Sequence, residues 1–501
     1  MKKQVFNPYM PGWEYVPDGE PHVFGDRVYV YGSHDRFGAP IFCVNDYVCW
    51  SAPVKDLSDW KYEGIIYRKK QDPHNKTGLR CLYAPDVTQG PDGRFYLYYA
   101  FDFMGEMGVA VCDTPAGKYE FYGHVHFKDG HIWGTKSGEP FPFDPGVLTD
   151  EDGKVYLYSG FATKVPFFAS RGHNLTNEGG AVLELEQDMV TIKDGPTLLF
   201  PTKGKKGAFQ DHAFFEASSI RKIDGKYCFV YSSQHNHELC YAMAESPKGP
   251  FVYGGTLVDL GDLYLDGNTD EKKAANYLGN THGGMVEIDG QWYIFYHRQT
   301  NRSSYARQGC AEKLYRRIDG GFLQAEITSC GLNAGPLNGI GKYPASIACN
   351  LWAKEGTGRY DCTAPGRVFA RHPYFTQRTK DGEQRDTQYI ANMRDGAVAG
   401  FKYFHMGQAA EIEIEIQGNG KGVMQVSDRK DFSHINGEIV IHDGKFSSDN
   451  KRRYLRKENK NLGKTVEIFT GNLNIEEGRK PLFFRYKGTG KIDFISFTLK
   501  S

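Results

Sequence analysis

The chain has 501 residues and carries 61 Lys and Arg residues against 61 Asp and Glu residues, so its formal net charge is zero. Nucleic acids and anionic membranes are recognised by basic surfaces, and this balance argues against both as partners. The 32 Tyr, 33 Phe and 59 Gly residues are typical of short strands joined by tight turns. The composition favours an all-β protein, and the length favours two domains.

The amino-terminal segment and the cysteines indicate a compartment. MKKQVFNPYMPGWEY contains two lysines without an apolar stretch of signal-peptide length behind them. Nowhere in the chain do about eighteen apolar residues follow one another. The ten cysteines form no CxxC pair. We therefore expect a cytoplasmic protein with reduced thiols and no membrane partner.

One pattern returns five times along the first two thirds of the chain: a polar turn containing Gly next to Asp, followed by alternating Tyr and aliphatic residues. The copies are FGDRVYVYGS from Phe24, PDGRFYLYYA from Pro91, EDGKVYLYSG from Glu151, IDGKYCFVYS from Ile223 and IDGQWYIFYH from Ile288. Each copy predicts a hairpin, because Gly adopts the positive φ of a tight reversed turn. A second hairpin with a Pro-Gly turn follows some copies, as in CDTPAGKYEFYG from Cys112. Recurring four-stranded units predict a five-bladed β-propeller; the alternative is a β-sandwich with accidental similarity between hairpins.

The repeat ends near Ile327, where a Gly-, Pro- and Asn-rich stretch, CGLNAGPLNGIGKYPASIACN, marks a connector. Alternating runs such as AEIEIEIQGN from Ala410 and IDFISFTLK from Ile492 then predict further strands. We therefore predict a catalytic propeller over residues 1–327, a connector over 328–350 and a jelly-roll-like β-sandwich over 351–501.

A polar residue stands just before the first strand of each predicted blade. These residues are Asp18 with Glu20, Asp86, Asp144, Glu216 and His282. Taken singly, an acid before a strand is most often a turn former or an exposed rim residue. A ring, however, brings equivalent positions to one axis, and crowded carboxylates beside aromatic residues raise one another's pKa. A carboxyl group that keeps its proton near neutral pH can act as a general acid. A donor and a base of this kind are the minimum apparatus for hydrolysing a glycosidic bond.

Four ordered motifs resemble glycoside hydrolase family 43, whose members are five-bladed propellers that hydrolyse arabinose- or xylose-containing glycans with inversion. The motifs are NPYMPGWEYVPDGEPHVFGDRVYVYGSHD, YAPDV, FFEASSIRKIDGKY and THGGMVEIDGQWYIFYHR. The resemblance implies that Glu216 is the general acid, that Asp86 sets its pKa, and that Asp18 is the general base, with Glu20 as the alternative base. It also implies that His282 and Arg298 contact the substrate. Asp144 ranks lower, because FDPGV reads equally well as the start of a strand.

The resemblance implies no required cofactor and no catalytic metal, although a structural Ca²⁺ near His282 fits some members of the family. The carboxyl-terminal part resembles, more weakly, the family 6 carbohydrate-binding modules, with Tyr374, Phe375, Tyr403 and Phe404 as a candidate sugar platform.

The expected function is hydrolysis of oligosaccharide or polysaccharide substrates by an α-L-arabinofuranosidase or β-xylosidase, with inversion. Inversion predicts catalytic carboxyl groups roughly 6.5–9.5 Å apart. The alternatives are a carbohydrate-binding propeller without catalysis, a fructan-active hydrolase, and a glycoside phosphorylase, which needs a cationic phosphate cluster.

Overall fold

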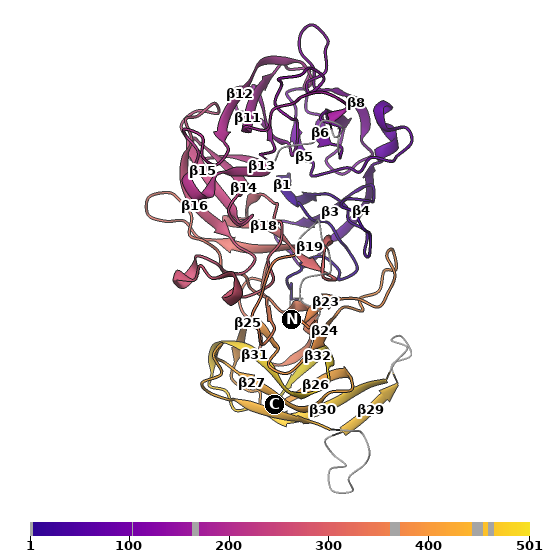
Figure 1. Cartoon of the computed structure of the whole chain (residues 1–501), viewed down its shortest axis with the longest axis vertical. Coiled ribbons are helices and arrows are strands. Elements are labelled where there is room, and N and C mark those ends of the chain that lie inside the picture. Colours follow the sequence, from indigo (N-terminus) through magenta and orange to yellow (C-terminus); the bar gives the residue numbers. More distant parts are fainter. Residues whose placement is uncertain (1–3, 103, 163–169, 361–370, 443–453, 459–464) are drawn as a thin grey trace.

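The computed structural model describes residues 4–102, 104–162, 170–360, 371–442, 454–458 and 465–501, with the side chains of 454–458 left aside. Its larger part is a ring of β-sheets, drawn from indigo to salmon in Figure 1, and its smaller part is a pair of sheets drawn from orange to yellow. The amino terminus lies between the two parts (Figure 1). In the described part of the chain no helix has the length and apolar character that a bilayer-spanning helix needs.

Four sheets of the ring have four antiparallel strands each, in chain order. The first holds β1 (Glu20–Phe24), β2 (Arg27–Tyr31), β3 (Tyr47–Pro53) and β4 (Lys61–Tyr67); the second β5 (Asp86–Gln89), β6 (Phe95–Ala100), β7 (Met107–Cys112) and β8 (Glu120–His124). The third holds β9 (Gly146–Thr149), β10 (Val155–Gly160), β11 (Gly179–Leu185) and β12 (Ile192–Pro201); the fourth β13 (Phe214–Ile223), β14 (Lys226–Ser233), β15 (Leu239–Ala244) and β16 (Val252–Val258). The fifth sheet holds β17 (Met285–Ile288), β18 (Gln291–Thr300) and β19 (Ser303–Leu314). This sheet has three strands, one fewer than the four predicted for each blade.

The first strands of the five sheets touch one another in a closed circuit, β1 with β5, β5 with β9, β9 with β13, β13 with β17 and β17 with β1. This circuit confirms the predicted propeller. The amino-terminal segment lies against β19, where the amide of Tyr9 donates to the carbonyl of Gly309 and the side chain of Asn7 bonds to both backbone groups of Ala311. Residues from the start of the chain thus cover the open side of the last blade and close the ring.

The turns follow the predicted chemistry. In the hairpins β13–β14 and β17–β18 the two turn residues are Asp-Gly, and both adopt positive φ, at 51° and 78° for Asp224 and Gly225 and at 53° and 79° for Asp289 and Gly290. Two positive φ values in a two-residue loop are the requirement of a type I′ turn, whose twist matches that of the flanking strands.

The remaining strands form two sheets that face each other. One is six-stranded and holds β20 (Leu337–Asn338), β25 (Val398–Met406), β31 (Gly478–Thr489), β27 (Lys421–Ser427) and β28 (Gly437–Ile441), with β22 (Asn350–Trp352) beside β25. The other is seven-stranded and holds β23 (Tyr374–Thr376), β24 (Tyr389–Met393), β32 (Ile492–Lys500), β26 (Glu411–Gly418), β30 (Thr465–Asn472) and β29 (Tyr454–Glu458), with β21 (Gly341–Pro344) beside β32. Strands β20 and β21 and the first residue of β22 therefore come from the segment 328–350 that was predicted as a connector.

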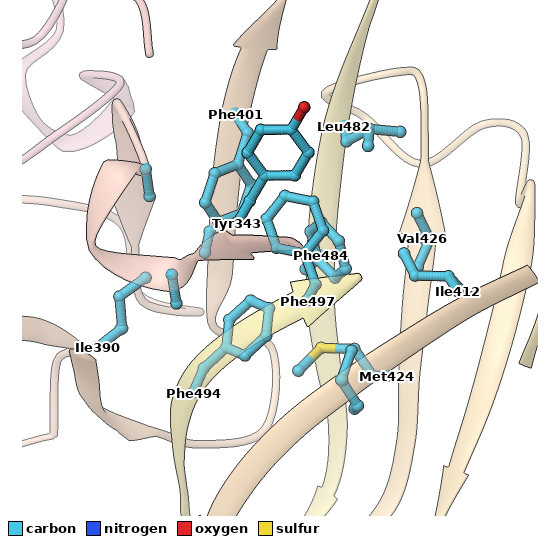
Figure 2. Packing of buried hydrophobic residues seen from close by; sticks show 14 of the residues in the cluster. Tyr343, Ile390, Phe401, Ile412, Met424, Val426, Leu482, Phe484, Phe494 and Phe497 are labelled. Atoms are coloured by element: carbon cyan, nitrogen blue, oxygen red, sulfur yellow. The ribbon is translucent and has the colours of Figure 1, made fainter. Parts of the chain in front are cut away.

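Alternation of apolar and polar residues produces the core of this sandwich. In β26 the three Ile residues are buried and the Glu residues between them are half-buried, as the period of two in a strand requires. Figure 2 shows Phe484, Phe494 and Phe497 packed between the sheets with Ile412 and Met424. The short 3-10 helices are η1 (Lys69–Gln71), η2 (Pro73–Asn75), η4 (Gln210–His212), η5 (Leu265–Gly267), η6 (Glu271–Lys273) and η7 (Ala345–Ile347). The nine cysteines in the described ranges are free thiols, and Cys362 lies outside those ranges.

Candidate active site

Asp18 precedes the inner strand of the first blade, in the left-handed conformation with φ of 56°. Its carboxylate is buried, and Oδ1 accepts a hydrogen bond from Nη1 of Arg307 at 2.9 Å while Nδ1 of His297 lies 3.3 Å away. Burial alone would raise the pKa of Asp18, but the charge of Arg307 and the contact with His297 outweigh burial and hold that pKa well below its ordinary value. Oδ2 has no hydrogen-bond partner among the described residues. Asp18 is therefore an ionised carboxylate with one oxygen left to act on another molecule.

Arg307 is held in place from the opposite side by Asp35. Nε and Nη2 of Arg307 donate to the two carboxylate oxygens of Asp35 at 2.9 and 3.1 Å, and all three residues are buried. A bidentate pair fixes the guanidinium plane as well as its position. Sequence reasoning missed Arg307, for which the available signal was one charged residue next to a polar one, Arg-Gln, inside the strand run SSYARQGC.

Glu216 lies at an irregularity in the inner strand of the fourth blade. The pairing of β13 with β14 shifts on both sides of Glu216, and the next residue, Ala217, has φ of 70°. Such a bulge re-aims a side chain that regular pairing would point elsewhere. Glu216 is half-buried and its carboxyl group makes no hydrogen bond to any described residue. Burial and the nearby charge of Asp18 raise its pKa to about 8, although Arg307 acts in the opposite direction. Glu216 is thus a protonated, accessible acid at neutral pH.

Asp144 is the carboxylate that contacts the segment of Glu216. Its Oδ2 accepts a hydrogen bond from the amide of Ala217 at 3.1 Å and lies 3.5 Å from Nδ1 of His282. Burial and repulsion from Glu216 and Asp18 raise the pKa of Asp144 well above its ordinary value. Asp144, which was ranked lower, thus stands just before a strand and also places its side chain against the neighbouring blade.

Asp86 is the first residue of the inner strand of the second blade. Its Oδ1 pairs with Nε2 of His22 at 2.7 Å and accepts from the amide of Val87, and its Oδ2 accepts from the amide of Val147 at 2.7 Å. These partners belong to the first three blades, and among the described residues Asp86 makes no hydrogen bond to Glu216. Asp86 ties the inner strands together, and its influence on the pKa of Glu216 stays a prediction.

Glu20, the alternative base, is turned toward the fourth blade. Its Oε1 accepts hydrogen bonds from Oγ of Ser219 at 2.8 Å and from the guanidinium of Arg221. Burial and the neighbouring Asp86 raise the pKa of Glu20 to about 7 although Arg221 opposes this. Because Oε1 is engaged by Ser219 and Arg221, Oε2 is buried and the pKa is raised, Glu20 is less suited than Asp18 to activate a water molecule.

His282 lies on the same axis, buried beside Asp144 and within the field of Asp18. Burial and the positive groups His297 and Arg307 lower its pKa to about 4 although Asp18 opposes this, so the imidazole is neutral at pH 7. Ca²⁺ takes six to eight oxygen ligands. Among the described residues, His282 belongs to none of the groups of His, Cys, Asp and Glu close enough to share an ion. The protein ligands present therefore do not fit a Ca²⁺ site at His282, and no step is assigned to a metal.

Arg298, predicted to contact the substrate, lies away from the carboxylates. Its guanidinium donates to the carbonyls of Ser346 and Ala348 at 2.7 and 3.1 Å and stacks over the ring of Phe375 at 3.8 Å, all in the boundary with the sandwich. Adjacent residues of a strand point to opposite faces, so His297 reaches Asp18 while Arg298 faces away. The structure thus brings His297, and not its neighbour Arg298, to the carboxylates.

The predicted sugar platform of the sandwich is wrong. Phe375 and Phe404 are buried, with 3% and 0% exposure. The rings of Tyr374 and Tyr403 are covered by the guanidinium groups of Arg302 and Arg479, at 4.4 and 3.5 Å. These aromatic residues serve packing, so they offer no continuous face to a sugar.

A chain of aromatic rings surrounds the carboxylates at the end of the propeller where the inner strands begin. Neighbouring ring centres lie between 4.6 and 6.4 Å apart, and all the rings but Phe143 are half-buried. In order the rings are Tyr305, Phe42, Tyr83, Phe143, Phe161, Phe215 and His237. Together they bring aromatic side chains from all five blades around one group of carboxyls. Such walls suit the C–H faces of a sugar ring, while Asp18, Asp144 and Glu216 supply the polar groups.

The sequence and the fold were compared with those of known proteins. The sequence model of glycosyl hydrolases family 43 matches residues 14–322. The chain is 46% identical over 501 residues to a xylosidase/arabinosidase from Thermoclostridium stercorarium, covering 100% of this chain and 99% of the relative. It is 30% identical over 325 residues to xylosidase/arabinosidase 43A from Humicola insolens, covering 56% of this chain and 88% of the relative. The crystal structure of the GH43_1 enzyme from Xanthomonas citri complexed with xylose aligns with a TM-score of 0.50 at 24% identity, covering 63% of this chain and 92% of the other, and supports the fold alone.

Proposed function

Because the chain belongs to family 43 of the glycosyl hydrolases, and is therefore a glycoside hydrolase, we propose that it hydrolyses arabinose- or xylose-containing oligosaccharides with inversion. The substrate class is supported by the names of the relatives, in particular the xylosidase/arabinosidase that matches the whole chain. The aromatic rings near the carboxyl groups agree with a sugar substrate, whose C–H faces pack against aromatic side chains.

Glu216 acts as the general acid in this proposal. Its protonated carboxyl group donates a proton to the glycosidic oxygen while the bond from that oxygen to the anomeric carbon breaks. The single observation that carries the assignment is the raised pKa of a half-exposed carboxyl group that has no hydrogen-bond partner among the described residues.

Asp18 acts as the general base. Oδ2 accepts a proton from a water molecule whose oxygen forms the new bond to the anomeric carbon, on the face opposite the leaving group. The charge of Arg307 keeps Asp18 ionised and ready to accept. After the step Asp18 holds one proton and Glu216 has lost one, and exchange with solvent restores both groups.

Asp144, in place of Asp86, is the positioning residue for the acid. By accepting from the amide of Ala217 it fixes the strand irregularity that aims Glu216. Asp86 keeps a structural task in the inner ring of strands.

The phosphorylase alternative needs free cations near the acids. Arg307 forms ion pairs with Asp18 and Asp35, and Arg221 forms one with Glu20. Neither guanidinium is therefore free to bind phosphate, and no observation favours the phosphorylase. The decisive experiment incubates the protein with nitrophenyl β-xyloside and nitrophenyl α-L-arabinofuranoside and follows the anomeric proton of the first product by NMR. Inverted configuration in phosphate-free buffer is the expected result. Retention, a requirement for phosphate, or binding without turnover would each overturn the proposal.

A further inference from the structure

A second group of reactive side chains lies in the fourth blade, outside the catalytic acids. It consists of His212 in η4, Glu238 just before β15, and Cys240 in β15. Nδ1 of His212 lies 2.6 Å from Oε1 of Glu238, and Sγ of Cys240 lies 3.4 Å from the same oxygen and 3.8 Å from Nδ1. One nitrogen, one oxygen and one sulfur atom thus lie within 4.8 Å of one another.

The separations agree with those of ligands around a small tetrahedral ion. Zn²⁺ binds sulfur at about 2.3 Å and nitrogen or oxygen at about 2.0–2.2 Å, so tetrahedral ligands lie roughly 3.3–3.6 Å from one another. The sulfur distances of 3.4 and 3.8 Å are close to this range. The shorter contact of 2.6 Å between His212 and Glu238 is a hydrogen bond that an entering ion replaces with two ligand bonds.

An independent observation is an oxygen of Glu238 that lacks a partner. Glu238 is 1% exposed, and its Oε2 is buried without a hydrogen bond. Within the described chain its one ion-pair partner is His212, and no Lys or Arg approaches it. A buried carboxylate oxygen without a partner is costly, and a bound cation removes that cost.

Two other groups of potential ligands do not combine nitrogen, oxygen and sulfur ligands with a buried carboxylate that lacks a Lys or Arg partner. Around Asp72, His74 and His124, the carboxylate oxygens accept from the amide of His74 and from Tyr99 and His124, so none is left over. Glu20, His22 and Asp86 also lie together, but Arg221 already supplies a positive charge there.

We propose that His212, Glu238 and Cys240 bind one Zn²⁺ ion, with the fourth position taken by water on the half-exposed side of His212. A mixed nitrogen, oxygen and sulfur set favours zinc over Ca²⁺ and Mg²⁺, which prefer oxygen alone. On binding, the thiol of Cys240 becomes a thiolate and its proton passes to solvent. The ion joins η4 to β15 and so fixes the segment that leads into β13, four residues before Glu216. This site is structural and does not depend on the catalytic roles proposed above.

The test uses the full chain, freed of metal with a chelator, and Zn²⁺ alone as the probe. Equilibrium dialysis with elemental analysis should show one Zn²⁺ per chain in the unmodified protein and in Cys112→Ser, which alters a half-buried cysteine of the second blade. Cys240→Ser and His212→Gln should bind Zn²⁺ weaker by at least about 10-fold, a loss comparable to disturbing the surroundings of a metal site. Zn²⁺ should raise the melting temperature of the unmodified protein and of Cys112→Ser only.

Cobalt supplies a readout that does not depend on the folding of Cys240→Ser. Co²⁺ bound through a thiolate gives a near-ultraviolet charge-transfer band, which we expect in the unmodified protein and in Cys112→Ser. His212→Gln changes a half-exposed side chain and keeps an amide that can donate to Glu238, so it should fold and lose most of the band at equal Co²⁺; a thermal melt of this variant checks the fold. Absence of the band from the unmodified protein, absence of bound Zn²⁺, or equal binding in His212→Gln would overturn the proposal.

Discussion

Oδ2 of Asp144 accepts a hydrogen bond from the amide of Ala217 at 3.1 Å, and this contact crosses from the third blade to the fourth. It reaches the backbone directly after Glu216, at a point where the strand is irregular. The position of one carboxyl group is thereby linked to that of another, although residues 144 and 216 are 72 positions apart in the chain. The contact makes Asp144 the positioning residue of the proposed mechanism.

Replacing Asp144 by Ala should lower kcat while the alkaline limb of the pH–rate profile stays in place. The change removes the oxygen that accepts from the amide of Ala217 and so frees the strand irregularity that aims Glu216. The limb stays because the pKa of Asp144 is itself raised well above its ordinary value, and, besides burial, the charge that raises the pKa of Glu216 is that of Asp18. Profiles of kcat over pH 5–10, a range of about five units chosen to bracket the raised pKa, check this.

Asp86→Ala is the matched variant, and its loss should fall on the contacts with His22 and Val147. An alkaline limb that moves in Asp86→Ala and not in Asp144→Ala would return the modulating role to Asp86.

Glu216→Gln should lose about 10²–10⁴-fold in kcat on substrates with poor leaving groups, the usual contribution of a general acid. Substrates with a dinitrophenolate leaving group need no proton and should be affected much less. Glu245→Gln, an exposed change in the same blade, should be silent. The measurement is kcat for a series of aryl xylosides; an equal loss for every leaving group would contradict the role of proton donor.

Glu216→Gln should also be more stable than the unmodified protein near pH 8 and not near pH 4. The pKa of Glu216 rises from 4.5 to about 8 on folding. Between these values the unfolded chain ionises Glu216 while the folded chain keeps the proton, so the contribution of this group to stability falls as pH rises. Gln carries no such penalty. Urea unfolding of both proteins at several pH values tests this, and a difference that does not grow with pH would contradict the raised pKa.

Arg307→Met should destabilise the protein by about 3–5 kcal/mol, because it leaves two buried carboxylates, Asp18 and Asp35, without their cation. Arg307→Lys keeps a charge but loses the bidentate contact, and should lose less. In the Lys variant the pKa of Asp18 should rise, so the acidic limb of the kcat profile moves to higher pH. Urea unfolding and the pH–rate profile are the two readouts. An acidic limb that does not move would show that Arg307 does not set the pKa of Asp18.

Arg298→Met should lower the melting temperature while leaving KM for a nitrophenyl glycoside unchanged. Its guanidinium contacts the carbonyls of Ser346 and Ala348 and the ring of Phe375, so the substitution removes contacts at the boundary between propeller and sandwich. Kinetics and thermal melts together check this. A large rise in KM with an unchanged melting temperature would restore the predicted contact with substrate.

The sequence by itself determined the propeller, and its resemblance to a known family supplied the proposed acid and base, with Glu20 as the alternative base. Five hairpins at regular spacing, with Gly next to Asp in each turn, are local features, because the positive φ of Gly and the alternation of Tyr with aliphatic residues act over a few residues. Asp18 and Glu216 stand at equivalent places in two of these repeats. The ring geometry that follows from the repeats places both on one axis.

Only the tertiary structure decided which neighbours those acids have. Asp86 and Asp144 lie at the start of the inner strands of two neighbouring blades and look alike in sequence, yet one bonds to His22 and Val147 and the other to Ala217. His297 and Arg298 are adjacent, and the pleat of β18 sends them in opposite directions. Arg307 pairs with Asp18 across 289 positions of the chain. Charge pairing and hydrogen bonding depend on distances of about 3 Å, which no local pattern specifies and which the packing of one blade against the next sets.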